Sequence, residues 1–289
     1  MPELPEVETV KRTLNKLIAG KTIEHVEVRL ARIIQKPEDP ELFAAWLAGR
    51  TFQKVERRGK FLRLCLDELV LVSHLRMEGR YGVYQADEPV EKHTHVIFRL
   101  QDGLELRYKD VRQFGTMHLF LPGEEWEHPP LNKLGMEPLD EQFTWQALRD
   151  VLQHRKGKIK SLLLNQSLIA GIGNIYADEA LYAARLHPER SADSLTTPEW
   201  KRLHEAIVKT LQDSVAKGGS SIKSYVNGQG EMGMFQQELQ AYGREHEPCL
   251  RCGRTLRKII VGGRGTHYCS NCQRMKRKKT IATPSTTST

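Results

Sequence analysis

The sequence predicts an α+β protein of several domains, and four observations support this. Apolar and polar residues alternate in the first part of the chain, and apolar residues recur with helical spacing from residue 144 onward. A proline-rich connection over residues 128–138 separates the two patterns, and two Cys-x-x-Cys pairs follow the helical part. We therefore expect domains at residues 1–135, 136–235 and 236–274, and a tail at 275–289 that is predicted to be disordered.

The first region opens with a helical stretch over residues 6–17 and then becomes strand-like. Residues 22–28, 61–66 and 95–100 alternate between apolar and polar side chains, and Gly and Pro residues punctuate these segments. This pattern is typical of a β-sandwich or a β-barrel.

The second region is predicted to be helical over residues 144–153, 158–166, 175–184 and 198–217. It ends in two loop signals, Gly-Gly-Ser-Ser at 218–221 and Asn-Gly-Gln-Gly at 227–230. A loop of this length indicates a functional segment.

The charge of the chain favours a polyanionic partner, chiefly through its distribution. The net charge is +8 and the pI is about 9.2, which by themselves are a weak indication. Residues 248–289, however, contain ten Lys or Arg and no Asp or Glu. A solubilising tail is the simpler explanation for residues 276–279 alone.

The sequence predicts no membrane-spanning segment. No apolar run approaches the roughly 20 residues that span a bilayer. The N-terminus lacks the basic and apolar parts of a secretory signal, so we expect a cytoplasmic protein with no membrane partner.

Four of the five cysteines form the pattern C-x2-C-x16-C-x2-C. Disulfides are rare in the cytosol, so the pattern predicts one structural zinc ion bound by Cys249, Cys252, Cys269 and Cys272. Residues 256–268 between the pairs are predicted to form a β-hairpin with Arg264 in its glycine-rich turn. A zinc hairpin alone does not specify a function, and Arg264 taken alone is equally well explained as a solvated turn residue.

The N-terminus, PELPEVET at residues 2–9, has three carboxylates in an otherwise basic protein. A helix start explains the prolines and acids, because both suit the first turn. It does not explain why proline is the second residue. Methionine is normally removed before a small residue, which would leave Pro2 with a free secondary amine.

From these residues onward the chain resembles the formamidopyrimidine-DNA glycosylase family, the bacterial 8-oxoguanine glycosylases. The resemblance extends to about Arg274 and includes six motifs in the family's order. They are PELPEVET (2–9), RRGK (57–60), HLRMEG (74–79), DVRQFG (110–115), GIGNIY (171–176) and the four cysteines. It implies a β-sandwich, a helix–two-turn–helix domain and a zinc β-hairpin, with DNA held between them. It further implies a monomer without an organic cofactor that repairs double-stranded DNA containing oxidised bases.

The resemblance assigns the chemistry to four residues. Pro2 is the nucleophile, because an N-terminal amine has a pKa of about 7.7–8.0 and is partly neutral at pH 7. Its attack on the sugar C1′ releases the base and forms an iminium, which acidifies the C2′ proton and permits strand cleavage. Glu3 is the acid that assists base departure. Lys60 donates a proton in β-elimination, and Arg264 acts in δ-elimination, where we expect it mainly to bind phosphate.

The resemblance also assigns residues that bind DNA. Met77, Arg112 and Phe114 match a triad that fills the gap left by the extruded base, with Arg112 facing the orphaned cytosine. Taken singly, they are better explained as core or surface residues. Phosphate contacts are expected from His93, Arg155, Lys160, Asn174 and Tyr242, with Asn174 as a helix N-cap. A lesion-capping loop comprises Gly218, Gly219, Ser220, Ser221, Ile222, Lys223, Ser224 and Tyr225.

Three alternatives remain open from the sequence. The endonuclease VIII branch shares Pro2, Glu3, a lysine and the finger but prefers oxidised pyrimidines. A non-catalytic DNA-binding protein on the same fold would need neither a Pro2 amine nor Glu3. A zinc ribbon that binds protein leaves the N-terminal motifs unexplained.

Overall fold

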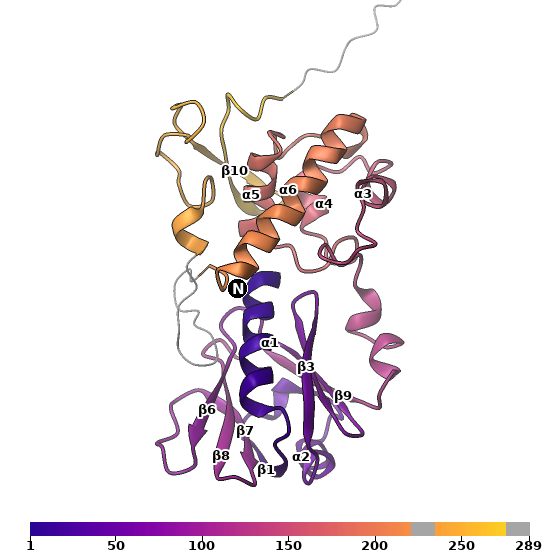
Figure 1. The fold of residues 1–289 in the computed structure, drawn as a ribbon, viewed down its shortest axis with the longest axis vertical. Helices are drawn as coiled ribbons and strands as arrows, with labels where there is room; N and C mark the ends of the chain where they lie inside the picture. Colours follow the sequence, from indigo (N-terminus) through magenta and orange to yellow (C-terminus); the bar gives the residue numbers. More distant parts are fainter. Residues whose placement is uncertain (221–234, 276–289) are drawn as a thin grey trace, which may run out of the picture.

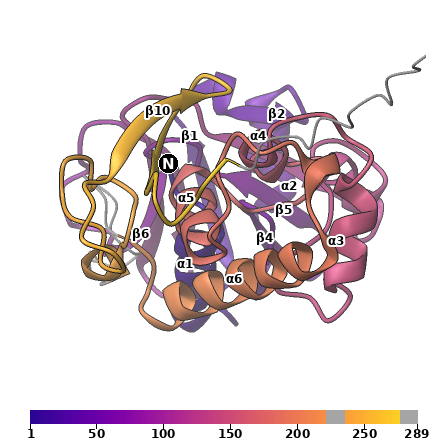
Figure 2. The same ribbon diagram turned by 90° about the horizontal axis from the view of Figure 1, so that it is seen from above.

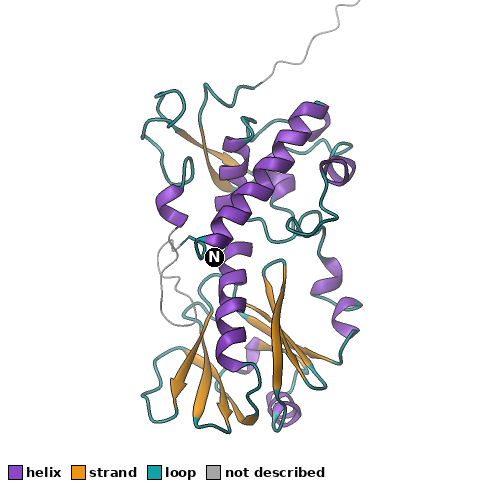
Figure 3. Ribbon diagram, in the orientation of Figure 1, coloured by secondary structure: helices purple, strands orange, loops and turns teal. Residues whose placement is uncertain are grey.

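The structure is a computed structural model that describes residues 1–220 and 235–275. It has a strand-rich half and a helical half, with the cysteine module beside the helices (Figures 1 and 3). Helix α1 (Leu4–Ile18) begins at the boundary between the halves and runs along the strand-rich one (Figure 1). The N-terminus, where the predicted nucleophile lies, is therefore placed between the two halves.

The strand-rich half contains two sheets. The first has the order β1 (Ile23–Val28), β7 (Thr94–Leu100), β8 (Leu104–Lys109) and β6 (Arg80–Gln85), with all neighbours antiparallel. The second has the order β2 (Ile34–Lys36), β9 (Thr116–Phe120), β5 (Val70–His74), β4 (Phe61–Leu66) and β3 (Phe52–Arg58), in which β2 alone is parallel to its neighbour. Because the two sheets share no strand, the predicted sandwich is confirmed and a closed barrel is not formed.

A single apolar core lies between the sheets and extends to α1. The helix contributes Val7, Val10, Leu14 and Ile18, which are spaced by three or four residues and therefore share one helical face. The opening helix is confirmed, and it starts two residues earlier than predicted because Glu3 serves as its N-cap.

The helical half consists of α3 (Trp145–Leu152), α4 (Ile159–Leu163), α5 (Asn174–Ala183) and α6 (Thr197–Ala216), so all four predicted helices are present. They enclose a second apolar core that includes Trp200 and Tyr176. Leu4 belongs to this second core, whereas Val7, one turn further along α1, belongs to the first. The first turn of α1 thus joins the two halves.

Two sequence expectations about helices were wrong. Residues 40–47 form helix α2 (Pro40–Leu47), which the strand-like interpretation of the first region missed. Its start signal was present, because Asp39 accepts a hydrogen bond from the Glu41 amide at 2.8 Å and Pro40 occupies the first turn. Asn174 is the first residue of α5 and not its N-cap, which is Gly173.

The cysteine module contains the predicted hairpin, formed by β10 (Arg257–Val261) and β11 (Arg264–Tyr268). Gly262 and Gly263 make the turn with φ angles of +56° and +73°, and Arg264 is the first residue of β11. Figure 2 shows the hairpin and α5 from above, and hydrogen bonds described below connect β11 to α5 and α5 to the start of α1.

The domain boundaries given above stay predictions, and the tail beyond residue 275 lies outside the described residues. Within the described part of the chain, none of the helices combines the length and apolar character needed to cross a membrane.

Candidate active site

The Glu3 side chain lies at the point where two helices begin. Glu3 caps α1, and its carboxylate also accepts hydrogen bonds from the first turn of α5, from the Ile175 amide at 3.0 Å and the Tyr176 amide at 3.4 Å. Amides at a helix start have no partner within the helix and favour an anion. In the structure these two amides therefore bind the protein's own Glu3 carboxylate, and the phosphate contact expected of Asn174 stays a prediction.

Two glycines make room for this arrangement. A side chain on Gly173 would place its Cβ 2.2 Å from the Glu3 carboxyl carbon. Gly171 has a φ of +90°, its carbonyl accepts the Leu4 amide at 3.0 Å, and a Cβ there would lie 2.6 Å from the Leu4 side chain. The GIG segment therefore lets the first turn of α1 approach α5 closely.

Burial raises the pKa of Glu3 from 4.5 to about 7. Lys60 and the two α5 amides oppose the rise, whereas the negative charge of Glu6 adds to it. With 3% of its surface exposed, the carboxyl cannot be stabilised by water in its charged form. A carboxyl with this pKa holds and releases a proton near neutral pH, as a general acid requires.

Replacing Glu3 by Gln is expected to raise the melting temperature near pH 8, with a much smaller gain near pH 5. The Glu3 pKa rises on folding from 4.5 to about 7, so its contribution to stability is present below 4.5 and is lost as the pH rises through 7. Near pH 8 the ionised carboxylate opposes folding by roughly 3 kcal/mol, and a neutral amide avoids this cost. Thermal melts at the two pH values measure the difference.

The control for this variant is Glu24→Gln, which neutralises an exposed carboxylate on β1. Its melting temperature should differ from that of the parent protein by similar, small amounts at both pH values. An equal shift for Glu3→Gln at the two pH values would contradict the raised pKa.

Lys60 lies in the turn between β3 and β4 and is buried, with 5% of its surface exposed. Burial lowers its pKa, the charges of Glu3 and Glu6 oppose this, and Arg264 lowers it further. An ammonium with a lowered pKa gives up its proton more readily, which suits the predicted proton transfer.

Glu137, in the connection between the halves, fixes the turn that carries Lys60. Its carboxylate pairs with Arg57, with Arg58 at 2.8 Å and with the Gly59 amide at 2.9 Å. Arg57 also pairs with Glu8 on α1 at 3.1 Å. The helix, the turn and the connection are thereby held in one network of partly buried charges.

Pro2 is buried next to Glu3, and Met1 is exposed. Met1 precedes Pro2 in the described chain, so here the Pro2 nitrogen is an amide. Burial lowers the pKa of the terminal amino group at Met1, and the charges of Glu3 and Glu6 oppose this. The role of Pro2 as nucleophile stays a prediction.

Glu6 connects the start of α1 with the end of α6. Its carboxylate accepts hydrogen bonds from the Glu3 amide at 2.8 Å, the Tyr176 hydroxyl at 2.5 Å and the Ser220 amide at 2.8 Å. Burial raises the pKa of Glu6, and the bonds from Tyr176 and Ser220 oppose the rise. Within the predicted lesion loop, Gly218, Gly219 and Ser220 are described, and Ser221, Ile222, Lys223, Ser224 and Tyr225 lie outside the described residues.

The three predicted gap-filling residues are exposed and belong to two turns. Met77 is 38% exposed and Phe114 53%, and the Arg112 guanidinium lies 5.2 Å from the Phe114 ring centre. Asp110, fully buried, holds the second turn by accepting the amides of Arg112 at 3.1 Å, Phe114 at 2.9 Å and Gly115 at 2.8 Å. Large apolar side chains that project into solvent from turns can insert between DNA bases. The exposure of these residues agrees with the predicted filling of the gap, which stays a prediction.

Four of the predicted phosphate contacts are at least partly accessible: His93, Asn174 and Tyr242 are half-buried, and Arg155 is exposed. His93 has a left-handed φ of 68°, and its carbonyl accepts the Asp110 amide at 3.0 Å. Their contacts with phosphate stay predictions.

Lys160 is placed differently from the expectation. Its side chain is fully buried, and its ammonium lies 2.6 Å from Asp178. A direct phosphate contact would require the ammonium to leave this ion pair, so the described geometry does not support that role. Burial lowers the pKa of Lys160, and the charge of Asp178 opposes this.

Glu179, also on α5, holds the segment that leads into the cysteine module. Its buried carboxylate accepts the successive amides of Gln240, Ala241 and Tyr242 at 2.8–2.9 Å. Burial raises the Glu179 pKa and these amides oppose the rise. Tyr242 is thereby placed with its ring centre 5.1 Å from that of His267.

The buried acids that sequence reasoning missed in this region include Glu6, Asp110, Glu137, Asp178 and Glu179. Glu6 follows Glu3 by three residues, which is the spacing of a capping box and could have been noticed. Asp110 lies in a recognised motif, but its task was not inferred. We find no sequence signal for Asp178 or Glu179, because their partners are far away in the chain.

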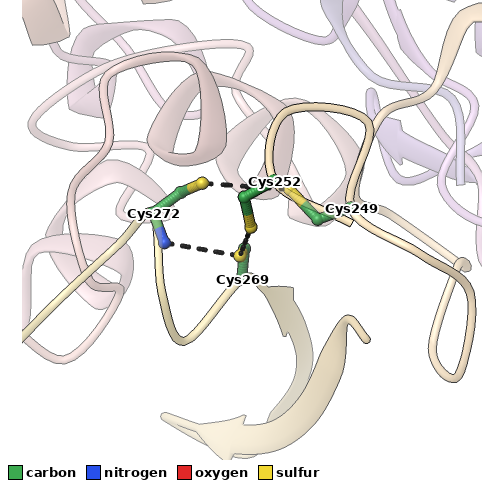
Figure 4. A group of neighbouring side chains, drawn as sticks. All are labelled: Cys249, Cys252, Cys269 and Cys272. Carbon is green, nitrogen blue, oxygen red and sulfur yellow. Dashed lines mark hydrogen bonds between the residues drawn. The ribbon is translucent and has the colours of Figure 1, made fainter. Parts of the chain in front are cut away.

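The four cysteine sulfurs lie within 4.8 Å of one another (Figure 4). The Cys249–Cys272 sulfurs are 3.9 Å apart and the Cys252–Cys269 sulfurs 3.6 Å. A tetrahedral zinc site with Zn–S bonds of about 2.3 Å requires sulfurs about 3.8 Å apart, so the residues fit one structural zinc ion. The Tyr182 hydroxyl lies 3.1 Å from the Cys249 sulfur and supports the site from α5.

Comparison with known proteins decides the family. Three family profiles match: "Formamidopyrimidine-DNA glycosylase N-terminal domain" at residues 1–117, "Formamidopyrimidine-DNA glycosylase H2TH domain" at 134–226 and "Zinc finger found in FPG and IleRS" at 247–274. The chain belongs to the formamidopyrimidine-DNA glycosylase family. As a member it is a base-excision-repair DNA glycosylase with AP lyase activity and a structural zinc finger.

Individual relatives extend this likeness to almost the whole chain. The formamidopyrimidine-DNA glycosylase of Brevibacillus brevis is 62% identical over 274 residues, which are 95% of this chain and 99% of that protein. Wild-type Lactococcus lactis Fpg, solved with DNA containing N7-benzyl-Fapy-dG, is 42% identical with a TM-score of 0.89 over 95% of this chain and 100% of its own. The same protein solved with DNA containing an oxidised pyrimidine is 41% identical, with a TM-score of 0.88 over 95% and 100%.

Proposed function

We propose that this glycosylase excises oxidised purines, namely 8-oxoguanine and formamidopyrimidines, from duplex DNA through Pro2. The observation that carries the proposal is the Glu3 carboxyl, with a pKa of about 7, at the start of α5 and in the electrostatic field of buried Lys60. An acid and an ammonium with opposite pKa shifts suit a reaction that first protonates a leaving base and then moves a sugar proton.

The proposed steps start with the neutral Pro2 amine. Its lone pair forms a bond to C1′, the bond from C1′ to the base breaks, and Glu3 protonates the departing base. The Glu3 carboxylate then takes the Pro2 N–H proton and passes it to O4′ as the C1′–O4′ bond breaks, which leaves an iminium between Pro2 and C1′. The iminium lets the C2′ proton leave, with Lys60 in proton transfer. The electrons of the C2′–H bond form the C2′=C3′ bond, and the C3′–O bond breaks so that the phosphate leaves with the electron pair of that bond. Arg264 then neutralises the phosphate expelled in the second elimination.

We further propose a monomer that prefers lesions opposite cytosine and acts on chromosomal DNA in the bacterial cytoplasm. The preference for cytosine is supported by Arg112, which is exposed beside the Phe114 ring and offers a planar donor for the orphaned base. Oxidised pyrimidines are the second candidate substrate, because a relative was solved with DNA containing one.

Borohydride trapping tests the proposal directly. Protein confirmed to begin at Pro2 is mixed with a duplex containing 8-oxoguanine opposite cytosine, and the cross-linked residue is identified by mass spectrometry. We expect an adduct on Pro2, and a weaker one when cytosine is replaced by adenine. A duplex with an oxidised pyrimidine, run in parallel, ranks the two substrate classes.

The matched control is the same protein with Met1 retained, because its Pro2 nitrogen is an amide and cannot attack. An adduct of equal yield in this control, or none from zinc-loaded protein that begins at Pro2, would refute Pro2 as the nucleophile. A higher yield with the oxidised pyrimidine would replace the purine assignment with the pyrimidine one.

A further inference from the structure

A buried ion pair connects the helical half with the zinc hairpin. Lys160 on α4 and Asp178 on α5 are 2.6 Å apart, and neither side chain is exposed to solvent. Removing two charges from water is costly, and the attraction between them often fails to offset that cost. Two apolar residues could fill the same space without this cost. We therefore explain the presence of the charged pair by the other groups to which Lys160 and Asp178 bind.

Lys160 holds the strand that begins with Arg264. Besides Asp178, its ammonium donates to the Gly265 carbonyl at 3.1 Å and to the Thr266 hydroxyl at 2.7 Å. The ammonium therefore has two hydrogen-bond acceptors on β11 and one paired carboxylate on α5. The Asn174 side chain donates to the same Gly265 carbonyl at 2.9 Å.

Asp178 holds the next residue of the same strand. Its second oxygen accepts the His267 amide at 2.8 Å and lies 3.2 Å from the His267 ring nitrogen. Side chains of α4 and α5 thus bind three consecutive residues of β11. Among the described residues, the one strand paired with β11 is β10. A two-stranded ribbon is marginally stable alone, and here the helices supply the partners that a third strand would provide.

The hairpin turn also lies against α4. A Cβ added to Gly262 would lie 2.7 Å from the Ser161 hydroxyl, so the turn approaches the residue that follows Lys160. Arg264 comes directly after this turn and is exposed. Among the residues that the structure describes, its guanidinium has no hydrogen-bond or ion-pair partner, so its position depends on the backbone that carries it.

That position matters because Arg264 lies within electrostatic reach of the active site. Its charge lowers the pKa of both Lys60 and Lys160, and the charge of Glu3 also acts on Lys160. A displacement of β11 would therefore move the guanidinium relative to Glu3 and Lys60 without changing any residue that contacts the substrate.

We propose that Lys160 and Asp178 are positioning residues that place the Arg264 guanidinium for the second elimination. The inference rests on the function proposed above for Arg264. In that step a C4′ proton passes to water, its bonding electrons form the C4′=C5′ bond, and the C5′–O bond breaks. The phosphate leaves as an anion with the electron pair of the C5′–O bond, and the guanidinium neutralises it.

The experiment compares Lys160→Met, Asp178→Asn and the double variant on a duplex with a preformed abasic site. Gel electrophoresis separates the β- and δ-elimination products, and metal analysis confirms one zinc per chain in each sample. We expect both single variants and the double variant to lower the δ/β ratio about 10-fold or more, because small displacements of a charge-stabilising group are costly. The rate of β-elimination should stay within about threefold, because Pro2, Glu3 and Lys60 are unchanged.

The double variant separates positioning from stability. Lys160→Met alone leaves a buried carboxylate without its cation and should lower the melting temperature, whereas the double variant removes both charges and should recover much of it. A purely structural role would restore the δ/β ratio together with the melting temperature, and that result would overturn the proposal. Should a single variant fail to fold, the double variant carries the test.

Two controls complete the design. Lys209→Met breaks the exposed Lys209–Asp213 pair on α6, with nitrogen and oxygen 3.0 Å apart, and should leave the ratio unchanged. Arg264→Ala tests the function proposed for Arg264 separately.

If Arg264→Ala leaves the δ/β ratio unchanged, the role proposed for Arg264 fails. If it lowers the ratio but the Lys160 and Asp178 variants do not, only the positioning proposal fails. The positioning proposal would also be overturned if the δ/β ratio fell only in samples that had lost zinc.

Discussion

Gly173→Ala is expected to reduce excision of 8-oxoguanine by about 100-fold or more while the protein stays folded. The new Cβ would lie 2.2 Å from the Glu3 carboxyl carbon and 2.4 Å from one of its oxygens, so the carboxyl must leave the start of α5. Gly173 has an ordinary extended backbone, with a φ of −125°, so alanine introduces no backbone strain. Single-turnover excision assays measure the effect.

The test is specific because the variant should lose base excision and largely keep the later strand cleavage. Cleavage of a preformed abasic site needs no protonation of a leaving base, so it should fall much less than excision. Gly157→Ala is the matched control, because Gly157 also has no left-handed φ and its nearest neighbour would be a flexible Leu162 side chain at 3.1 Å. Equal losses of excision and of abasic-site cleavage in Gly173→Ala would refute the role of Glu3 as the acid for base departure.

Removing zinc is expected to weaken binding to lesion-containing DNA by about 100-fold and to abolish δ-elimination. The hairpin has only two strands, and its own apolar cluster is small, consisting of Tyr182, Ala241, Leu256 and two of the cysteines. Without the metal this module cannot keep Arg264 in place, because structural zinc supplies about 10–16 kcal/mol of apparent binding free energy. Fluorescence anisotropy during chelator titration measures the affinity.

The sandwich should survive this treatment. Its core includes no residue of the cysteine module, so a cooperative thermal transition should remain in the metal-free protein. Cys269→Ser should reproduce the effect of the chelator, whereas Cys65→Ser, which replaces another buried cysteine, should retain one zinc. Unchanged affinity in protein shown to be free of metal would contradict the prediction.

Features encoded within short stretches of chain could be predicted well. The helices and the three strands that we singled out lie at or within a few residues of their predicted positions, because periodicity and caps act over a few residues. The spacing of the four cysteines predicted a cluster whose sulfurs do meet. Helix α2 was missed although Asp39 and Pro40 signalled its start, because the surrounding strand pattern was given more weight.

Assignments made by resemblance varied with the environment of each residue. Lys60 and Glu3 are brought into one electrostatic field, as the motifs implied. Lys160, which the resemblance assigned to phosphate without a quoted motif, is buried in an ion pair. A motif identifies a residue type at a position, and burial then decides whether that residue faces the solvent and the DNA or the protein's own interior.

The sequence by itself determined the succession of sandwich, helices and zinc hairpin, the zinc ligands, and the family. The tertiary structure decided the chemistry of the site, because Glu3 takes its raised pKa from burial and its hydrogen bonds from amides 172 and 173 residues away. The same holds for Lys160, whose partners on β11 lie 105 and 106 residues further along the chain. Such contacts leave no local periodicity in the sequence, and burial, which sets the pKa, exists only after the chain has folded.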